Sequence, residues 1–400
     1  MAHLRNKFWI TALTLSLITF GQFAIDIYLP SFASMQKQLK TSAGMIQLTL
    51  TFYLISYGFT QLIYGPLSDR FGRRKVLLSG MIIFIAGSFG TYIAPTIGWV
   101  LATRFIQGLG ISSANVLCRA ILRDLYPGPE LDKKTPYLGM VWVIPPIIAP
   151  VLGGYIENLF GWRSNFLFLA GIVCIEFLLV YFFLPETKDP SEVHSIHPKV
   201  IWKNYKTLLS SRPFLGFVTT DLILFGAFSC FYAVGPFLLQ VRLDLSAVSL
   251  GWMLLLMASG YMMGSFLNIF LTHRLPQKTI MSYGVLCICL VSLTMLTVAL
   301  MGIMTVFGIV ALQLLFFFGI GLIFTNCIAG CLKIFPPLAG SASALWGLFA
   351  FMGGTIGSSL MTLFSENNQL PLASIFTVQS FLVAIVLYAL VFRPTQQIQK

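Results

Sequence analysis

Runs of about 20 apolar residues recur along this chain, and they constrain its fold more than any other feature. A helix needs roughly 20 predominantly apolar residues to span a bilayer, whereas a barrel strand needs about 10 that alternate polar with apolar. Charged residues make up only 10% of the chain and hydrophobic residues 57%, so lipid must cover most of its surface. The sequence therefore predicts an all-α integral membrane protein with twelve spans near 8–29, 44–66, 76–95, 98–118, 137–157, 165–184, 214–238, 248–271, 279–300, 304–329, 340–364 and 371–392.

The distribution of Lys and Arg predicts which ends of the spans face the cytoplasm. With the N-terminus inside, all but five of the 25 Lys and Arg residues fall in cytoplasmic segments. This bias follows the positive-inside rule and places both termini in the cytoplasm. It also accounts for the net charge of +12 without nucleic-acid binding. The five exceptions are Arg104 within a span and Lys37, Lys40, Arg163 and Arg242 on the opposite face.

The longest polar stretch, 185–212, separates the sixth expected span from the seventh. It divides the chain into an N-terminal six-helix bundle at 1–184 and a C-terminal six-helix bundle at 213–400. Two halves of similar hydropathy are the organisation of a duplicated transporter, with 185–212 as a cytoplasmic loop between them.

Weak internal echoes favour such a duplication. Pro30 and Pro236 both lie near the outer end of the first helix of their half. Gly153-Gly154 in the fifth span has a counterpart at Gly353-Gly354 in the eleventh.

No motif for nucleotide, cofactor or metal chemistry is found in the sequence. There is no Gly-Lys pair and hence no P-loop, and Gly108-Leu-Gly110 lacks the preceding strand of a dinucleotide loop. The pairs Cys287-x-Cys289 and Cys327-x3-Cys331 do not have zinc-site spacing. We therefore expect no metal, no cofactor and no enzyme activity, and transport driven by an ion gradient or by the substrate's own gradient.

The loop between the second and third spans is a tight turn with one acid and four bases. It reads Gly65-Pro-Leu-Ser-Asp69-Arg70-Phe-Gly72-Arg73-Arg74-Lys75. The glycines permit close helix approach, and the acid can accept hydrogen bonds from helix N-terminal amides or from a nearby Arg. We predict a cytoplasmic latch that holds helices together, formed by Gly65, Asp69, Arg70, Gly72 and Arg73.

This loop matches the signature G-x-L-a-D-R-x-G-R-[KR]-[KR], and here the chain resembles the major facilitator superfamily. Further motifs extend the resemblance over the whole chain, with most of them in the first half. The segment Arg119-Ala-Ile-Leu-Arg123-Asp124-Leu resembles the Bcr/CflA drug-resistance subfamily. The other matches are Asp26-Ile-Tyr-Leu-Pro30 to D-x-Y-L-P, Arg104-Phe-Ile-Gln107-Gly108 to R-x-x-Q-G, Ala149-Pro150-Val-Leu-Gly153-Gly154 to G-P-x-x-G-G, and the typical Gly161-Trp162-Arg163 and Leu184-Pro185-Glu186-Thr187.

The resemblance implies twelve helices in two pseudo-symmetric bundles and efflux of drugs against a proton gradient. It assigns a coupling role to Asp26 and a supporting role to Arg104. It also implies that the antiporter motif, Pro150, Gly153 and Gly154, seals the protein against proton leak. The motif has Ala149 in place of the usual Gly, and the second half has only a vestige of the latch loop.

Four ionisable residues lie within the expected spans, where they are costly and therefore informative: Asp26, Arg104, Glu176 and Asp221. Asp26 follows Gln22 by one turn on the same helix face. Burial destabilises its charged form, which suits a group that takes up and releases a proton. Arg104 lies at similar depth, so proton release could accompany pairing with it. Asp221 is a possible second ionisable site or a snorkelling group near the interface, and Glu176 is a possible ionisable site without an evident role.

Polar and aromatic residues within the spans predict a mainly apolar substrate cavity that suits drug-sized amphiphiles. Interhelical hydrogen bonds and interface aromatics are the alternative interpretation for some of them. The candidates are Gln22, Tyr28, Tyr53, Tyr57, Gln61, Asn115, Phe231, Tyr232, Tyr261 and Asn326.

We therefore predict a proton-coupled exporter of small amphipathic or drug-like molecules that works by alternating access in a bacterial inner membrane. It would function as a monomer, with protons, the lipid bilayer and a small-molecule substrate as its partners. The alternative is a dedicated exporter or importer of one endogenous metabolite, such as a siderophore, because one fold can serve both directions.

Overall fold

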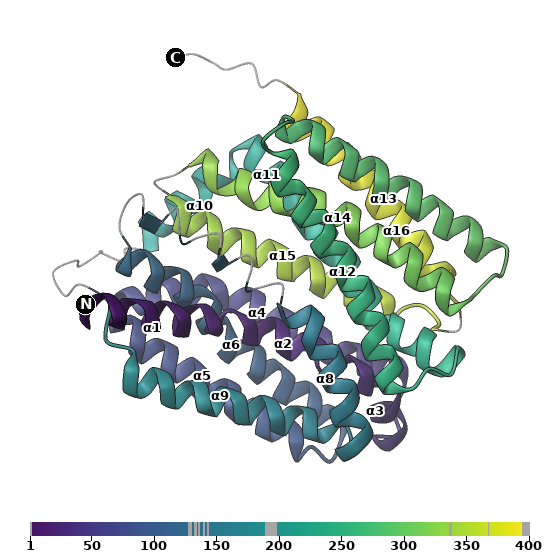
Figure 1. The fold of residues 1–400 in the computed structure, drawn as a ribbon, viewed down its shortest axis with the longest axis horizontal. Helices are drawn as coiled ribbons and strands as arrows, with labels where there is room; N and C mark the ends of the chain where they lie inside the picture. Colours follow the sequence, from purple (N-terminus) through teal and green to yellow (C-terminus); the bar gives the residue numbers. More distant parts are fainter. Residues whose placement is uncertain are drawn as a thin grey trace. The chain divides into compact units, whose positions relative to one another are not determined.

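The computed structural model describes residues 2–393 apart from 127–129, 132–133, 135–136, 139–140, 142–143, 189–197, 336–337 and 367. Every regular element in these ranges is helical (Figure 1). Parts of three predicted segments lie outside the described residues: the start of the fifth span, the middle of the 185–212 stretch and the C-terminal tail.

Ten of the described helices are long and apolar enough to cross a membrane. Two of the twelve expected spans fall outside this group. The span near 44–66 is α4 (Ala43–Phe71), which is long enough but carries buried polar side chains, among them Gln47 and Gln61. The span near 137–157 contains α8 (Ile144–Phe160), which is apolar and has 17 residues within the described range. Each predicted apolar run therefore coincides with a helix, and the all-α membrane fold is confirmed.

The chain forms two compact units, and the first comprises residues 1–197, 232–255 and 358–366. In this unit α6 packs closely against both α4 and α5, and α5 packs against α9 (Figure 1). Besides α4 and α8, this unit contains α1 (Ala2–Leu17), α2 (Thr19–Asp26), the 3₁₀ turn η1 (Leu29–Ser31), α3 (Phe32–Gln38), α5 (Arg73–Tyr92), α6 (Ile97–Leu125), α9 (Arg163–Phe183) and the π-helical turn η2 (Leu238–Arg242).

The second unit comprises residues 198–231, 256–357 and 367–400. Three helices contribute residues to both units: α11 (Arg212–Phe237), α12 (Ala247–Leu271) and α15 (Ala339–Met361). The predicted division at 184 and 212 stays a prediction. The other helices of the second unit are α10 (Pro198–Leu209), α13 (Gln277–Leu300), α14 (Val306–Ile334), α16 (Leu370–Val386) and the π-helical turn η4 (Leu387–Phe392).

Two predicted boundaries differ from the structure. The first span, expected at 8–29, continues through η1 and α3 to Gln38. Pro30 lies in η1, where its fixed φ and missing N–H suit a short 3₁₀ turn between two α-helical segments. The stretch 185–212, predicted as a loop, contains the helix α10, since its apolar residues recur at helical spacing between the charges.

Two glycines on α6 explain how one helix can pack tightly against two neighbours. Residues two apart on a helix point to nearly opposite sides, because each residue turns by about 100°. A Cβ at Gly108 would overlap the backbone of Tyr53 in α4, and one at Gly110 would overlap the backbone of Phe84 in α5. Gly108-Leu-Gly110, which is no dinucleotide loop, is thus a helix-packing device.

The second unit repeats this device on α14. A Cβ at Gly319 would lie 3.2 Å from the carbonyl oxygen of Gly284 in α13, and one at Gly321 would overlap the backbone of Tyr261 in α12. Both central helices also begin at a threonine cap. The Thr96 side chain accepts a hydrogen bond from the N–H of Trp99, and the Thr305 side chain accepts one from the N–H of Gly308.

Candidate functional site

Asp26 is the last residue of α2, and its side chain is fully buried in the first unit. Gln22 lies one turn earlier, and its Nε2 donates to Oδ1 at 3.2 Å and to Oδ2 at 3.1 Å. The rings of Tyr53 and Tyr232 are close enough to the carboxyl to interact with it electrostatically. Within the described part of the chain no cation forms an ion pair with Asp26. The hydrogen-bond partner of this buried carboxyl is therefore a neutral amide.

Arg104 is also fully buried, in the middle of three aromatic rings. Its guanidinium carbon lies 4.4 Å from the ring centroid of Tyr28, 4.2 Å from that of Tyr53 and 5.8 Å from that of Phe166. Nη1 donates to Oε1 of Gln107 at 2.7 Å, whereas Nε and Nη2 have no hydrogen-bond partner among the described residues. Cation–π attraction offsets part of the cost of burying this charge and leaves two N–H groups able to donate.

Tyr53 interacts with both Asp26 and Arg104. Its ring contacts the Arg104 guanidinium, it interacts electrostatically with Asp26, and its hydroxyl donates to the carbonyl of Gly21 at 2.7 Å. The predicted pairing of Asp26 with Arg104 is not present in this conformation, because each group is held by neutral partners instead.

Seven predicted cavity residues lie together in the first unit, and all are buried. The Tyr57 ring packs edge-on against Tyr53, with centroids 5.7 Å apart. Two polar atoms among them, Nε2 of Gln61 and Oδ1 of Asn115, are buried without a hydrogen-bond partner in the described ranges, so they can bind a ligand or water. The seven residues are Gln22, Tyr28, Tyr53, Tyr57, Gln61, Asn115 and Tyr232.

The other three cavity candidates lie in the second unit. Phe231 and Tyr261 belong to an aromatic cluster there, with Phe231 at 6.2 Å from Phe317 between ring centroids. The side-chain amide of Asn326 donates to Oδ1 of Asn268 at 2.7 Å and so joins α14 to α12. For Asn326 this bond favours the alternative interpretation, an interhelical hydrogen bond.

The remaining ionisable residues of the spans have different partners. Glu176 of α9 accepts a hydrogen bond from the Ser16 hydroxyl of α1 at 2.6 Å, which gives this carboxyl a role in joining two helices. Asp221 of α11 is fully buried rather than snorkelling, and its Oδ2 accepts a hydrogen bond from the Trp346 indole of α15 at 2.6 Å.

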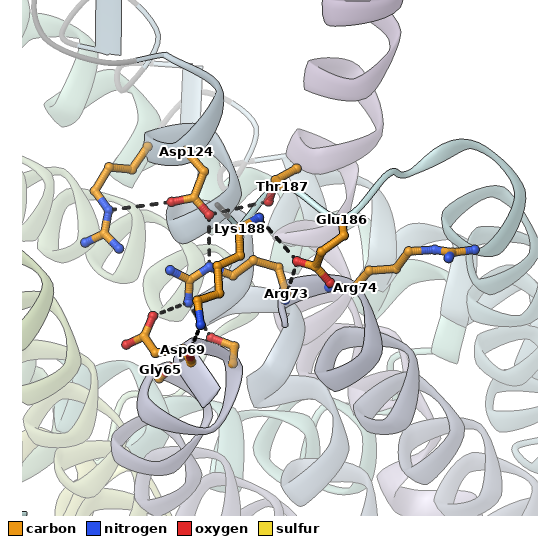
Figure 2. A network of polar contacts seen from close by, with 10 residues as sticks. Gly65, Asp69, Arg73, Arg74, Asp124, Glu186, Thr187 and Lys188 are labelled. Atoms are coloured by element: carbon orange, nitrogen blue, oxygen red, sulfur yellow. Dashed lines mark hydrogen bonds and ion pairs between the residues drawn. The ribbon is translucent and has the colours of Figure 1, made fainter. Parts of the chain in front are cut away.

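The predicted latch is built around the buried side chain of Arg73 (Figure 2). Its Nη1 lies 2.5 Å from Oδ1 of Asp69 and donates to the Ser68 hydroxyl at 2.6 Å, and that hydroxyl donates to the carbonyl of Gly65 at 2.8 Å. Its Nε lies 2.9 Å from Oδ2 of Asp124 in α6. The latch thus joins the end of α4, the start of α5 and the end of α6.

Arg70, which we also predicted in the latch, is exposed, and its guanidinium lies over the ring of Phe71 at 5.1 Å. A helix places neighbouring residues on different faces, so Arg70 points away when Asp69 points inward.

Sequence reasoning missed the latch residues that lie far along the chain. The Glu186 carboxylate accepts hydrogen bonds from the backbone N–H groups of Arg73 at 2.7 Å and Arg74 at 3.2 Å, and so caps α5. Lys188 donates to the backbone carbonyl of Asp69 (Figure 2). Gly72 has φ +97° and faces Glu186 so closely that a Cβ would overlap the carboxylate. The sequence showed the motif Leu184-Pro185-Glu186-Thr187, but nothing in the motif predicts that Glu186 contacts the start of α5.

The antiporter motif lies on α8, where its glycines approach two other segments of the first unit. A Cβ at Gly153 would overlap the carbonyl of Ile27, and a Cβ at Gly154 would lie 2.6 Å from the carbonyl oxygen of Ala247 in α12. The Asn165 amide, which the sequence did not single out, donates to the Ser31 hydroxyl at 2.9 Å and secures this crossing.

The comparisons with known proteins identify the family of this chain. Residues 11–358 match the family model described as Major Facilitator Superfamily. The chain is 30% identical over 387 residues to Multidrug resistance protein D of Escherichia coli (strain K12), covering 95% of each chain. It is 28% identical over 381 residues to a Bicyclomycin resistance protein homolog of Haemophilus influenzae, again over 95% of each.

Among solved structures, the crystal structure of a D-xylose-proton symporter matches with a TM-score of 0.78 at 15% identity and covers 96% of this chain and 97% of that one. At this identity the match shows the fold alone. With a family model over most of its length, two full-length relatives and the shared helical fold, this chain belongs to the major facilitator superfamily.

Proposed function

We propose that this chain is a proton-coupled exporter of small amphipathic or drug-like molecules in a bacterial inner membrane. The observation that carries the proposal is the fully buried Asp26, whose side-chain hydrogen bonds in the described part of the chain come from the neutral amide of Gln22. The full-length relatives named for multidrug and bicyclomycin resistance support export of drug-like compounds.

The chemistry of coupling follows from the neutral surroundings of the acid. A carboxylate without a cation is expensive in a dry site, so Asp26 is stable there as a neutral acid. It takes its proton from the outer water and gives it to the cytoplasm once the cavity opens inward. Loss of the proton leaves a carboxylate, which then attracts the Arg104 guanidinium through its two unused N–H groups. That rearrangement links the protonation state to the conformation.

The substrate class follows from the side chains around this pair. Aromatic rings surround Arg104, and the unpaired amide atoms of Gln61 and Asn115 can orient a ligand. A mainly apolar site with few polar anchors binds amphiphiles of many shapes. The six-helix bundles at 1–184 and 213–400 would alternate around it, in a monomer with both termini in the cytoplasm.

The experiment is export of a panel of lipophilic drugs from cells and into inverted vesicles, with and without a protonophore. We expect export that stops when the proton gradient is dissipated. Asp26→Asn should abolish proton-driven accumulation, because the amide cannot carry a proton, while binding of the drug persists.

The matched control is Glu176→Gln, which replaces another membrane carboxyl by its amide and should leave transport coupled. Unchanged coupling in Asp26→Asn would exclude Asp26 as the proton site. If the well-expressed protein exports no compound of the panel, the alternative of a dedicated metabolite transporter becomes the better reading.

A further inference from the structure

Asp221 is a second buried carboxyl, and the mechanism above does not use it. It lies on α11, nine residues after Arg212, and its side chain has no solvent exposure. Oδ2 accepts the hydrogen bond from the indole Nε1 of Trp346 at 2.6 Å. Oδ1 is buried and has no partner with hydrogen-bond geometry in the described parts of the chain. Besides the indole bond, this carboxyl interacts with the weakly donating thiol of Cys327.

Among the described residues, the groups that interact with this carboxyl from the surrounding helices are neutral at physiological pH. They are the Tyr261 hydroxyl of α12, the thiols of Cys327 and Cys331 of α14, and the Trp346 indole of α15. No Lys, Arg or His of the described residues forms an ion pair with it. A carboxylate would be left here without a cation, so the neutral acid is the stable form.

The ligand that fits this site is a proton. The side chain is fully enclosed, so a drug-sized cation would first have to separate the helices. A proton needs no space, and it converts Oδ1 into a hydroxyl or leaves it as the carbonyl oxygen of a neutral acid.

Asp221 also occupies the same place in its helix crossing as Asp26 does. Gly153 of α8 packs against the carbonyl of Ile27, the residue after Asp26. Gly353 of α15 packs against the carbonyl of Leu222, the residue after Asp221. The helices α8 and α15 are the fifth and eleventh expected spans, so the echo between their glycines extends to an acid on the first helix of each half.

The two acids differ in their position along that helix. Asp26 lies only four residues before Pro30, whereas Asp221 lies 15 residues before Pro236, although both prolines were expected near the outer end. At about 1.5 Å per residue, this difference corresponds to roughly 16 Å along the helix. The two acids therefore lie at different depths along their own helices.

We propose that Asp221 is a second proton-carrying carboxyl, so that each transport cycle moves one proton through Asp221 in addition to the proton on Asp26. An O–H bond forms on the Asp221 carboxylate with a proton from the outer water and breaks when that proton passes to the cytoplasmic water. This inference rests on the proposed proton-coupled export.

The test is the number of protons exchanged per substrate molecule in proteoliposomes of the full chain. The substrate is a panel compound that the wild-type protein exports. At fixed pH and voltage differences across the membrane, we measure the substrate concentration ratio at which net transport stops. Asp221→Asn should transport with one proton fewer per molecule, since the amide still accepts the indole hydrogen bond. Wild-type stoichiometry in this variant would overturn the proposal.

Trp346→Phe is the matched variant. It removes the indole donor but keeps the carboxyl, so the stoichiometry should stay that of the wild type. If the Asp221–Trp346 bond is merely structural, Trp346→Phe lowers stability, Asp221→Asn keeps the bond, and neither variant changes the proton count.

Infrared spectroscopy tests the same residue without any transport. Purified wild-type protein at neutral pH should show the carbonyl stretch of a protonated acid that Asp221→Asn loses and Asp26→Asn retains. Asp221→Glu should shift the band rather than remove it. If Asp221→Asn keeps the whole band, the proposal is overturned. A wild-type protein that exports nothing would contradict the proposed function, and the infrared band would still decide whether Asp221 is protonated.

Discussion

At the scale of single residues, the four ionisable groups that the sequence singled out within the spans each have a neutral partner of a different kind. Asp26 has an amide, Asp221 an indole, Glu176 a hydroxyl, and Arg104 has aromatic rings beside the amide of Gln107. A fixed counter-charge would hold such a group in one protonation state, whereas a neutral partner permits both. This arrangement therefore suits an aspartate that takes up and releases a proton during a cycle, whereas the guanidinium of Arg104 keeps its charge.

Among the described residues, the ion pairs lie in the latch, and Arg73 is at its centre. Arg73→Ala should lower the stability in detergent by about 1–3 kcal/mol, because it leaves Asp69 and Asp124 together without their cation. Thermal unfolding monitored by fluorescence would measure the loss as a lower Tm.

Arg123→Ala is the control for this prediction. Arg123 lies 4.0 Å from the other oxygen of Asp124, but its side chain is 53% exposed, so solvent screens the pair and the loss should be within about 0.5 kcal/mol. Equal losses for the two arginines would contradict the view that burial gives the latch its strength.

The sequence predicted the contact between neighbouring residues of the latch, but not the contacts with residues far along the chain. Asp69 and Arg73 are four residues apart and share a motif, so their contact was expected. Asp124 and Glu186 follow 51 and 113 positions after Arg73, and no local pattern connects them with it. The same holds for Trp346, which lies 125 positions from Asp221.

At the scale of helices, two helices can pack closely where glycines leave no side chain between their backbones. The central helices α6 and α14 each carry two glycines two residues apart, and each glycine faces a different neighbour. In lipid no hydrophobic force drives helices together, so close backbone packing of this kind contributes much of the attraction.

Gly110→Ala should therefore lower stability, whereas Gly171→Ala should not. At Gly110 the new Cβ meets the backbone of α5, and we expect a loss of about 1–3 kcal/mol. At Gly171 of α9 nothing lies within 4 Å, and the higher helix propensity of Ala should leave stability unchanged or raise it by up to about 1 kcal/mol.

The Tm of both purified variants in the same detergent checks this pair. A Gly110→Ala variant as stable as Gly171→Ala would show that α5 and α6 can separate at no cost, which the packing argument excludes.

At the scale of the whole molecule, the Lys and Arg distribution predicts which face of the membrane each loop occupies. We expect Lys40→Cys to react with a membrane-impermeant maleimide in intact cells. Lys75→Cys should react only in inverted vesicles, because the latch loop lies in the cytoplasm. Both side chains are exposed, so access through protein does not limit either reaction.

The native chain, which has seven cysteines, supplies the background labelling. Labelling of Lys75→Cys from outside the cell would reverse the topology and place the latch on the wrong side for the proposed mechanism.

The sequence by itself determined that this protein is helical, spans a membrane and belongs to its superfamily. The reason is local: a backbone in lipid must satisfy its own hydrogen bonds, so each apolar run of sufficient length becomes a helix. The sequence also singled out Asp26, Arg104 and Asp69, because a charged residue in or beside an apolar span can be identified without knowing its partner.

Only the tertiary structure decided which partners those residues have. It placed Arg104 among aromatic rings rather than beside Asp26, brought Glu186 to the start of α5, and put Asp221 in the crossing that corresponds to that of Asp26. Such meetings depend on which faces of distant helices come together. That choice is made by many small contacts at once, and above all by glycines at which two backbones can touch, so no single segment of sequence contains it.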